Sequence, residues 1–173
     1  MRHTSWDRND RNTPVLLEED GPQRLAVFSD DAAEFDGSRW QLQVEQSRGI
    51  KAVDAESGES RLTIDGNLAR AKRLLARAGE REFSFVNESG KNWIIDDENG
   101  NKVAQFTGSN RGVRRAVLEF DAEADAKPLQ RDEIIALSFA ARMILESRLS
   151  SSAVGIIATL LLCTVVAILA FLF

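Results

Sequence analysis

The fold class of this chain is decided by residues 93–106, WIIDDENGNKVAQF. Two apolar runs, 93–95 and 103–106, flank the pair Asn99-Gly100. Asn-Gly pairs favour tight hairpin turns, because these turns need residues with positive φ. The stretch therefore predicts an antiparallel β-hairpin.

Short strands of the same kind extend on both sides of this hairpin. In residues 39–46, RWQLQVEQ, every second residue is apolar, so Trp40, Leu42 and Val44 would face a core while the glutamines face water. Further strands are expected at residues 81–86 and 112–120, and further turns at Ser57-Gly58 and Ser89-Gly90. The sequence thus predicts a mainly β domain, an antiparallel meander of about seven to ten strands that forms a small barrel or a strongly curled sheet.

Composition divides the chain into four parts. Residues 1–22 are polar and contain two prolines, so they are expected to be a flexible leader. The antiparallel β domain would occupy residues 23–127, an apolar helix 128–150 and a transmembrane helix 151–173.

Residues 68–79, LARAKRLLARAG, are ambiguous within the β domain. Good helix formers and a final glycine favour a short helix. A pair of strands that turns at Ala78-Gly79 stays open as the alternative.

The expected helix before the transmembrane segment is apolar nearly all round. From Ile134 to Leu145 its only polar side chains are Ser138 and Arg142. Such a helix is buried on most sides. It could plug the interior of the β-barrel, or it could continue directly into the membrane as one long helix; the serines at 150–152 allow a break without requiring one.

The last 21 residues, 153–173, contain no charged side chain, whereas all 22 Lys and Arg and all 27 Asp and Glu lie at or before Arg148. At about 1.5 Å per residue a helix of this length spans roughly 30 Å, which matches the hydrocarbon core of a bilayer. A C-terminal single-pass membrane anchor is therefore expected.

The orientation of this anchor follows from the residues that flank it. Arg142 and Arg148 precede the span, and the first 25 residues lack the apolar core of a signal peptide, so the N-terminal domain is predicted to be cytoplasmic. The only cysteine, Cys163, lies within the span, which agrees with a reducing compartment.

Many strands in hairpins followed by one apolar helix resemble the tubby C-terminal-like superfamily, which includes the phospholipid scramblases and the LURP-one-related proteins. Three stretches carry the resemblance, namely residues 83–86 (FSFV), 93–104 (WIIDDENGNKVA) and 134–145 (IIALSFAARMIL). The resemblance covers most of positions 24–149 and implies a β-barrel of about twelve strands closed around a central hydrophobic helix. It also implies a membrane-associated domain that is not an enzyme.

Residue inventory agrees with a non-enzymatic function. His3 is the only histidine, so metal sites and Ser-His or Cys-His nucleophile arrangements lack their usual groups. No glycine-rich phosphate loop occurs. The acidic turn around Asp97 does not fit a calcium loop, because Phe106 would stand where a final carboxylate is required. No catalytic residue, cofactor or metal site is predicted.

Two features predict interactions. Basic residues cluster in two places and could contact anionic lipid or a partner. The first cluster consists of Arg70, Lys72, Arg73, Arg77 and Arg81, and the second of Arg111, Arg114 and Arg115. Small residues recur every four positions in the predicted span and form one stripe, consisting of Ser151, Gly155, Thr159, Cys163 and Ala167. Such stripes let transmembrane helices approach closely. Nucleic acid is not an expected partner, because the net charge is −5.

The sequence therefore predicts a membrane-anchored cytoplasmic β-domain that binds lipid or a protein partner at the membrane surface. The stripe could mediate self-association or packing against other membrane-protein subunits, and a span that serves only as an anchor stays open as the alternative. The alternative function for the whole chain is that of a single-pass accessory subunit of a larger membrane complex, such as a respiratory or transport assembly.

Overall fold

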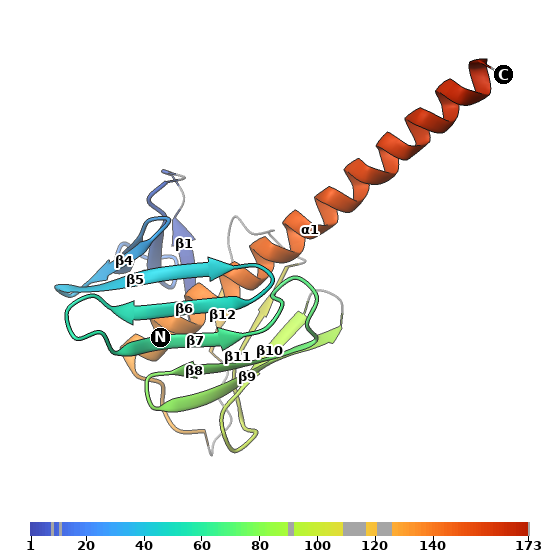
Figure 1. Ribbon diagram of the computed structural model, residues 1–173. Helices are drawn as coiled ribbons and strands as arrows, with labels where there is room; N and C mark the ends of the chain where they lie inside the picture. The colour runs from blue at the N-terminus through green and yellow to red at the C-terminus, as the bar shows by residue number, and fades with distance from the viewer. Residues whose placement is uncertain (8, 11, 90–91, 109–116, 121–125, 173) are drawn as a thin grey trace.

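The chain forms a closed antiparallel β-barrel of twelve strands with a long helix running out of it (Figure 1). This computed structural model describes residues 1–172 except 8, 11, 90–91, 109–116 and 121–125; within the last part of the helix, side chains are described up to Ser150 and at Cys163 and Thr164. The strands are β1 (His3–Asp7), β2 (Val15–Glu18), β3 (Arg24–Phe28), β4 (Ala32–Phe35), β5 (Ser38–Glu45), β6 (Gly49–Asp54), β7 (Ser60–Asp65), β8 (Arg73–Ala78), β9 (Arg81–Ser89), β10 (Asn92–Asp96), β11 (Lys102–Thr107) and β12 (Leu118–Glu119).

Each strand pairs with the next one along the chain, and the last strand closes the barrel on the first. Thr4 of β1 lies opposite Leu118 of β12, which in turn lies opposite Phe106 of β11. The mainly β class is confirmed, and the barrel has twelve strands where the sequence predicted seven to ten. The strands missed are short, so they offer too few alternating residues to recognise.

Two of these strands lie where a flexible leader was expected, so that prediction is wrong for residues 3–7 and 15–18. β1 and β2 pair in register from Thr4↔Glu18 to Asp7↔Val15. Trp6 and Leu16 are buried in the barrel core. Burial of these two large side chains fixes a segment whose other residues are mostly polar.

The predicted hairpins are confirmed where the structure describes them. β10 and β11 meet at Gly100, whose φ is 82°, and β6 and β7 meet around Gly58, whose φ is 73°. Gly90 of the predicted Ser89-Gly90 turn lies outside the described residues. So do residues 112–116 of the predicted strand 112–120, of which only Leu118–Glu119 are observed as a strand.

Residues 68–79 do not form the short helix that their composition favoured. Residues 73–78 form β8, which turns at Gly79 (φ 58°) into β9, so the strand-pair alternative is right. Leu74, Ala76 and Ala78 are buried on one face and alternate with exposed side chains. Burial of this alternating face outweighs a helix propensity that amounts to tenths of a kcal/mol per residue.

The helix α1 (Arg131–Leu172) fills the barrel with its first half, as the plug interpretation predicts (Figure 1). Ile135, Leu137 and Ala141 are at most 1% exposed. The Phe139 ring stacks on Phe28 of β3 with ring centroids 5.2 Å apart. A barrel wall on every side explains why this part of the helix is apolar all round.

The same helix passes residues 150–152 without a break and projects beyond the barrel (Figure 1). The two alternatives for the apolar helix are thus not exclusive, because one continuous helix both plugs the barrel and extends past it. The architecture is broadly like that of a tubby-like barrel with its central helix.

The two ends of the barrel are distinguished by the contacts of the helix. At the end where α1 begins, Arg131 pairs with Asp36 of the β4–β5 turn at 2.8 Å. At the opposite end, which we call the exit mouth, Gln46 of the β5–β6 turn donates from Nε2 to the backbone oxygen of Ser147 at 2.6 Å. Val44, predicted to face the core, lies beside this mouth and is 38% exposed, because the barrel opens there.

Candidate functional site

The exit mouth is where the helix leaves the barrel, and Arg148 is its central side chain. The Arg148 guanidinium lies over the Trp93 ring, 4.6 Å from the ring centroid. One of its terminal nitrogens donates a hydrogen bond to the backbone oxygen of Ala71, in the connection between β7 and β8. The helix is thereby tied to two separate parts of the barrel wall.

The charge of Arg148 is not balanced by any acidic group in the described part of the chain. Its Nε is buried and finds no hydrogen-bond acceptor there, and the Nε1 of Trp93 is in the same condition. Burial lowers the pKa of the Arg148 guanidinium below its ordinary value. A half-buried cation without a counter-ion favours the arrival of a negative charge.

Arg142, two turns deeper, shows the contrasting arrangement. Its guanidinium lies 4.6 Å from the centroid of the Trp6 ring, and its Nε donates to Glu146 at 2.9 Å. Arg142 is therefore satisfied within the barrel, and its role is structural.

The structure places the residues of the first predicted basic cluster at three different parts of the barrel. Arg70 and Lys72 are exposed at the exit mouth, on either side of the Ala71 that binds Arg148. Arg73 and Arg77 lie on the outer wall of β8. Arg81 is buried at the opposite end of the barrel, where it pairs with Glu133 at 3.2 Å.

The side chains on the outer wall are already engaged by their neighbours. The Nε of Arg73 donates to the Ser84 hydroxyl at 2.7 Å, and Arg77 pairs with Glu82 at 2.6 Å. The contact of these arginines and Lys72 with anionic lipid or a partner stays a prediction, and the structure places the four side chains on two surfaces, the exit mouth and the outer wall. A period of two along β8 directs Arg73 and Arg77 sideways, away from the mouth.

The second basic cluster, Arg111, Arg114 and Arg115, lies outside the described residues. For the stripe of small residues, the structure describes the helical backbone and the Cys163 side chain, which is exposed. The side chains of Ser151, Gly155, Thr159 and Ala167 lie outside the described ones. Both remain predictions.

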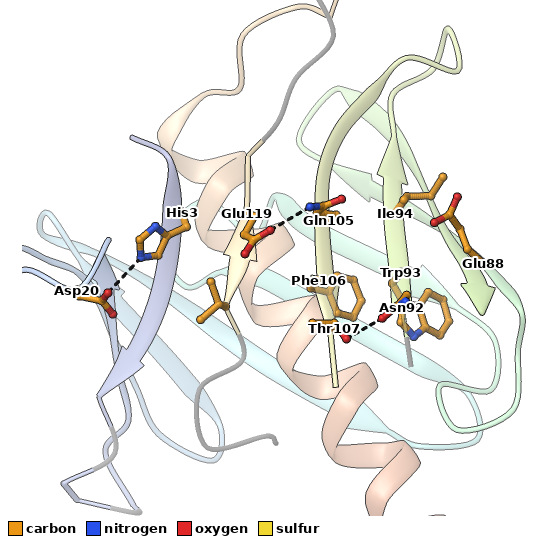
Figure 2. Close-up of a pocket in the computed structure, with 11 residues that line it drawn as sticks. His3, Asp20, Glu88, Asn92, Trp93, Ile94, Gln105, Phe106, Thr107 and Glu119 are labelled. Atoms are coloured by element: carbon orange, nitrogen blue, oxygen red, sulfur yellow. Dashed lines mark hydrogen bonds and ion pairs between the residues drawn. The ribbon is translucent and has the colours of Figure 1, made fainter. Parts of the chain in front are cut away.

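A separate pocket, of about 700 Å³, lies on the barrel wall where β10, β11, β12 and β1 meet (Figure 2). The residues around it come mainly from these strands, and include His3, Asp20, Glu88, Asn92, Gln105 and Glu119. Three carboxylates and one imidazole give this pocket a polar, mostly acidic lining.

The polar groups of the pocket mainly contact each other. Gln105 donates to Glu119 at 2.9 Å, and His3 lies 3.7 Å from a carboxylate oxygen of Asp20 (Figure 2). His3, which was expected in a flexible leader, is thus held on β1. These pairings follow the strands across the sheet, and none of them joins a nucleophile to a base.

Asp97 occupies the acidic β10–β11 turn, whose sequence does not fit a calcium loop. Its Oδ1 accepts backbone hydrogen bonds from Asn99 and Asn101, each at 2.9 Å, so the carboxylate organises the β10–β11 turn. Burial raises the pKa of Asp97, but the bonds from Asn101 and Asn99 and the charge of Arg81 outweigh it and hold the pKa below its ordinary value. Within the described residues, no three His, Cys, Asp or Glu side chains gather to hold a metal ion.

Comparison of the chain with protein-family models, curated proteins and solved structures gives no match. Over the residues that the structure describes, no helix has both the length and the hydropathy needed to cross a bilayer. The function must therefore be argued from the barrel, its exit mouth and the sequence of the helix beyond.

Proposed function

We propose that this chain is a non-enzymatic, tubby-like β-domain that is anchored in a membrane by the end of α1 and binds lipid or a protein partner at the cytoplasmic surface. One observation carries the proposal. The helix that plugs the barrel continues without a break from the exit mouth into the uncharged residues 153–173. The plug of the barrel and the proposed anchor are therefore segments of one continuous helix.

The number of residues between Arg148 and the uncharged segment of this helix sets the distance of the barrel from the membrane. Ala153, the first residue of the uncharged segment, follows Arg148 by five residues (153 − 148). At 1.5 Å per residue this is about 7.5 Å, which places the exit mouth in the headgroup layer when the segment spans a bilayer. The exit mouth is thus the surface that meets lipid or a membrane-bound partner.

In this proposal the barrel interior has a structural role, because apolar residues of α1, such as Leu137 and Ile144, pack in the core with the side chains of the wall. Most polar groups that line the wall pocket pair with one another, as Gln105 does with Glu119. A binding function at the mouth requires no reactive group.

Purification from native membranes in mild detergent, with an N-terminal tag, tests this function. Recovery of the chain from the membrane fraction, alone or as a small homo-oligomer, is the expected result. Stoichiometric recovery with unrelated membrane proteins would identify an accessory subunit instead. Recovery from the fraction that remains in solution after the membranes are pelleted would contradict the membrane anchor altogether.

A further inference from the structure

We propose that Arg70, Lys72 and Arg148 form a binding site for the phosphate groups of anionic lipids at the exit mouth. The proposal rests on the proposed function, since it takes the bilayer around α1 as the source of the ligand. It adds the chemical class of the lipid and the residues that recognise it.

The hydrogen bond from Arg148 to the Ala71 backbone oxygen assembles the site. Because Arg70 and Lys72 are the immediate neighbours of Ala71, this one bond draws three cations to the same side of the mouth. Asn67 shapes the connection from the other direction, since its Oδ1 accepts hydrogen bonds from the backbone of Ala69 and Arg70, each at 3.1 Å.

All three cations lack an ionic partner within the described chain. Arg70 and Lys72 are exposed, and neither forms an ion pair with a described acidic residue. Arg148 is half-buried against Trp93 and is likewise without a carboxylate. Arg48, on the neighbouring β5–β6 turn, differs in this respect, because it pairs with Glu45 at 3.4 Å. Uncompensated cations on neighbouring residues of one mouth are suited to a phosphate group.

The opposite end of the barrel is rich in exposed carboxylates. Each β-turn at that end presents at least one exposed carboxylate. These carboxylates include Asp20, Asp36, Glu56, Glu80 and Glu98. The exit mouth also carries exposed acids, both on the β3–β4 turn (Asp30 and Asp31) and at the ends of the strands beside the connection (Asp65 of β7 and Glu88 of β9). Attraction of an anionic membrane surface therefore depends on the three cations themselves and on the position of the mouth along α1.

The experiment uses the full chain in lipid nanodiscs, with Cys163→Ser and a single fluorophore on Ser47→Cys in the β5–β6 turn at the mouth. Quenching by lipids that carry a nitroxide on the headgroup is compared between phosphatidylcholine discs and discs that also contain phosphatidylserine. A second labelled chain, Ala55→Cys in the β6–β7 turn at the far end, serves as the reference position.

The site predicts that phosphatidylserine increases quenching at position 47 and leaves position 55 unchanged. The double variant Arg70→Gln/Lys72→Gln should lower the ratio of docked to undocked molecules about 25-fold, since each of the two basic residues contributes about a fivefold preference at an anionic surface. The matched control, Arg73→Gln/Arg77→Gln, removes the same charge from the outer wall and should leave quenching at position 47 unchanged.

Four results would count against the proposal, and they separate it from the proposed function. Equal quenching in both disc types, or equal loss in the two double variants, would overturn the lipid site while the anchor stands. A rise in unfolding temperature with inorganic phosphate in phosphatidylcholine discs, without any effect of phosphatidylserine, would assign the site to a soluble anion. Failure of the chain to enter discs at all would contradict the membrane anchor itself.

Discussion

Arg81 of β9 and Glu133 of α1 form an ion pair at 3.2 Å, and each side chain is only 7% exposed. The pair lies at the end of the barrel where the helix begins. Arg81 also donates to the Pro128 backbone oxygen, and Glu133 accepts a hydrogen bond from the Gln130 backbone at 2.7 Å. The ion pair therefore fixes the chain just before the helix and sets how deeply the plug enters.

Removal of one partner of this pair should be strongly destabilising. Arg81→Met leaves the Glu133 carboxylate buried without its main counter-ion, which costs about 3–5 kcal/mol. The double variant Arg81→Met/Glu133→Leu removes both charges and should recover most of that loss. Denaturant unfolding of the full chain in mild detergent measures the free energy of unfolding of the single and the double variant. Equal stability of the single variant and the unaltered chain would show that the pair does not hold the plug.

Ala141→Asp should unfold the barrel. Ala141 is 1% exposed on the plugging part of α1, so a carboxylate there would be buried without a described partner. The expected result is loss of the cooperative unfolding transition seen by near-UV circular dichroism. Ala55→Asp, in an exposed turn, is the control and should keep that transition. A cooperative transition in Ala141→Asp would contradict the plug.

Gly49→Ala should be far more costly than an alanine at other turn glycines. Gly49 has a φ of 131°, and a Cβ at this position would lie 1.8 Å from the backbone oxygen of Ile64. β6 and β7 would have to separate. Gly58 also has positive φ, but a Cβ there meets no atom within 4 Å, so Gly58→Ala should cost only about 1 kcal/mol. Comparison of the two unfolding midpoints checks the difference, and similar midpoints would refute the close approach at Gly49.

Acidification should weaken the β10–β11 turn through Asp97. Because the pKa of Asp97 is lower in the folded chain, the stability that this carboxylate contributes is present above its unfolded pKa and is lost as pH falls through the folded value. The loss is therefore expected below about pH 4, and Asp97→Asn should unfold with a shallower pH dependence in that range. Denaturant titrations at a series of pH values measure the two slopes. Identical slopes would mean that Asp97 contributes nothing through its charge.

Local signals in the sequence predicted the hairpins but not the number of strands. Asn99-Gly100 and Ser57-Gly58 are turns whose chemistry lies in two adjacent residues. β1 and β2 were missed because their pairing depends on burial of Trp6 and Leu16 against a helix more than a hundred residues later in the chain. Such long-range burial leaves little trace in a short, polar segment.

The candidate site was predicted only in part for a similar reason. Clustering in sequence identified Arg70 and Lys72 but placed them with Arg73 and Arg77, which the β8 alternation directs to the outer wall. Arg148 was noted only as a residue flanking the span. Its contact with Ala71 joins residues 77 positions apart, and no local pattern indicates such a contact.

Alkaline carbonate extraction of membranes from cells that produce the full chain, beside a variant that ends at Leu149, tests whether the end of α1 anchors the barrel. The full chain should stay in the membrane pellet, while the shortened chain, which keeps the plug and the whole barrel, should remain folded and move to the supernatant. Release of the full chain by carbonate would contradict the claim that residues 153–173 anchor this barrel in a bilayer.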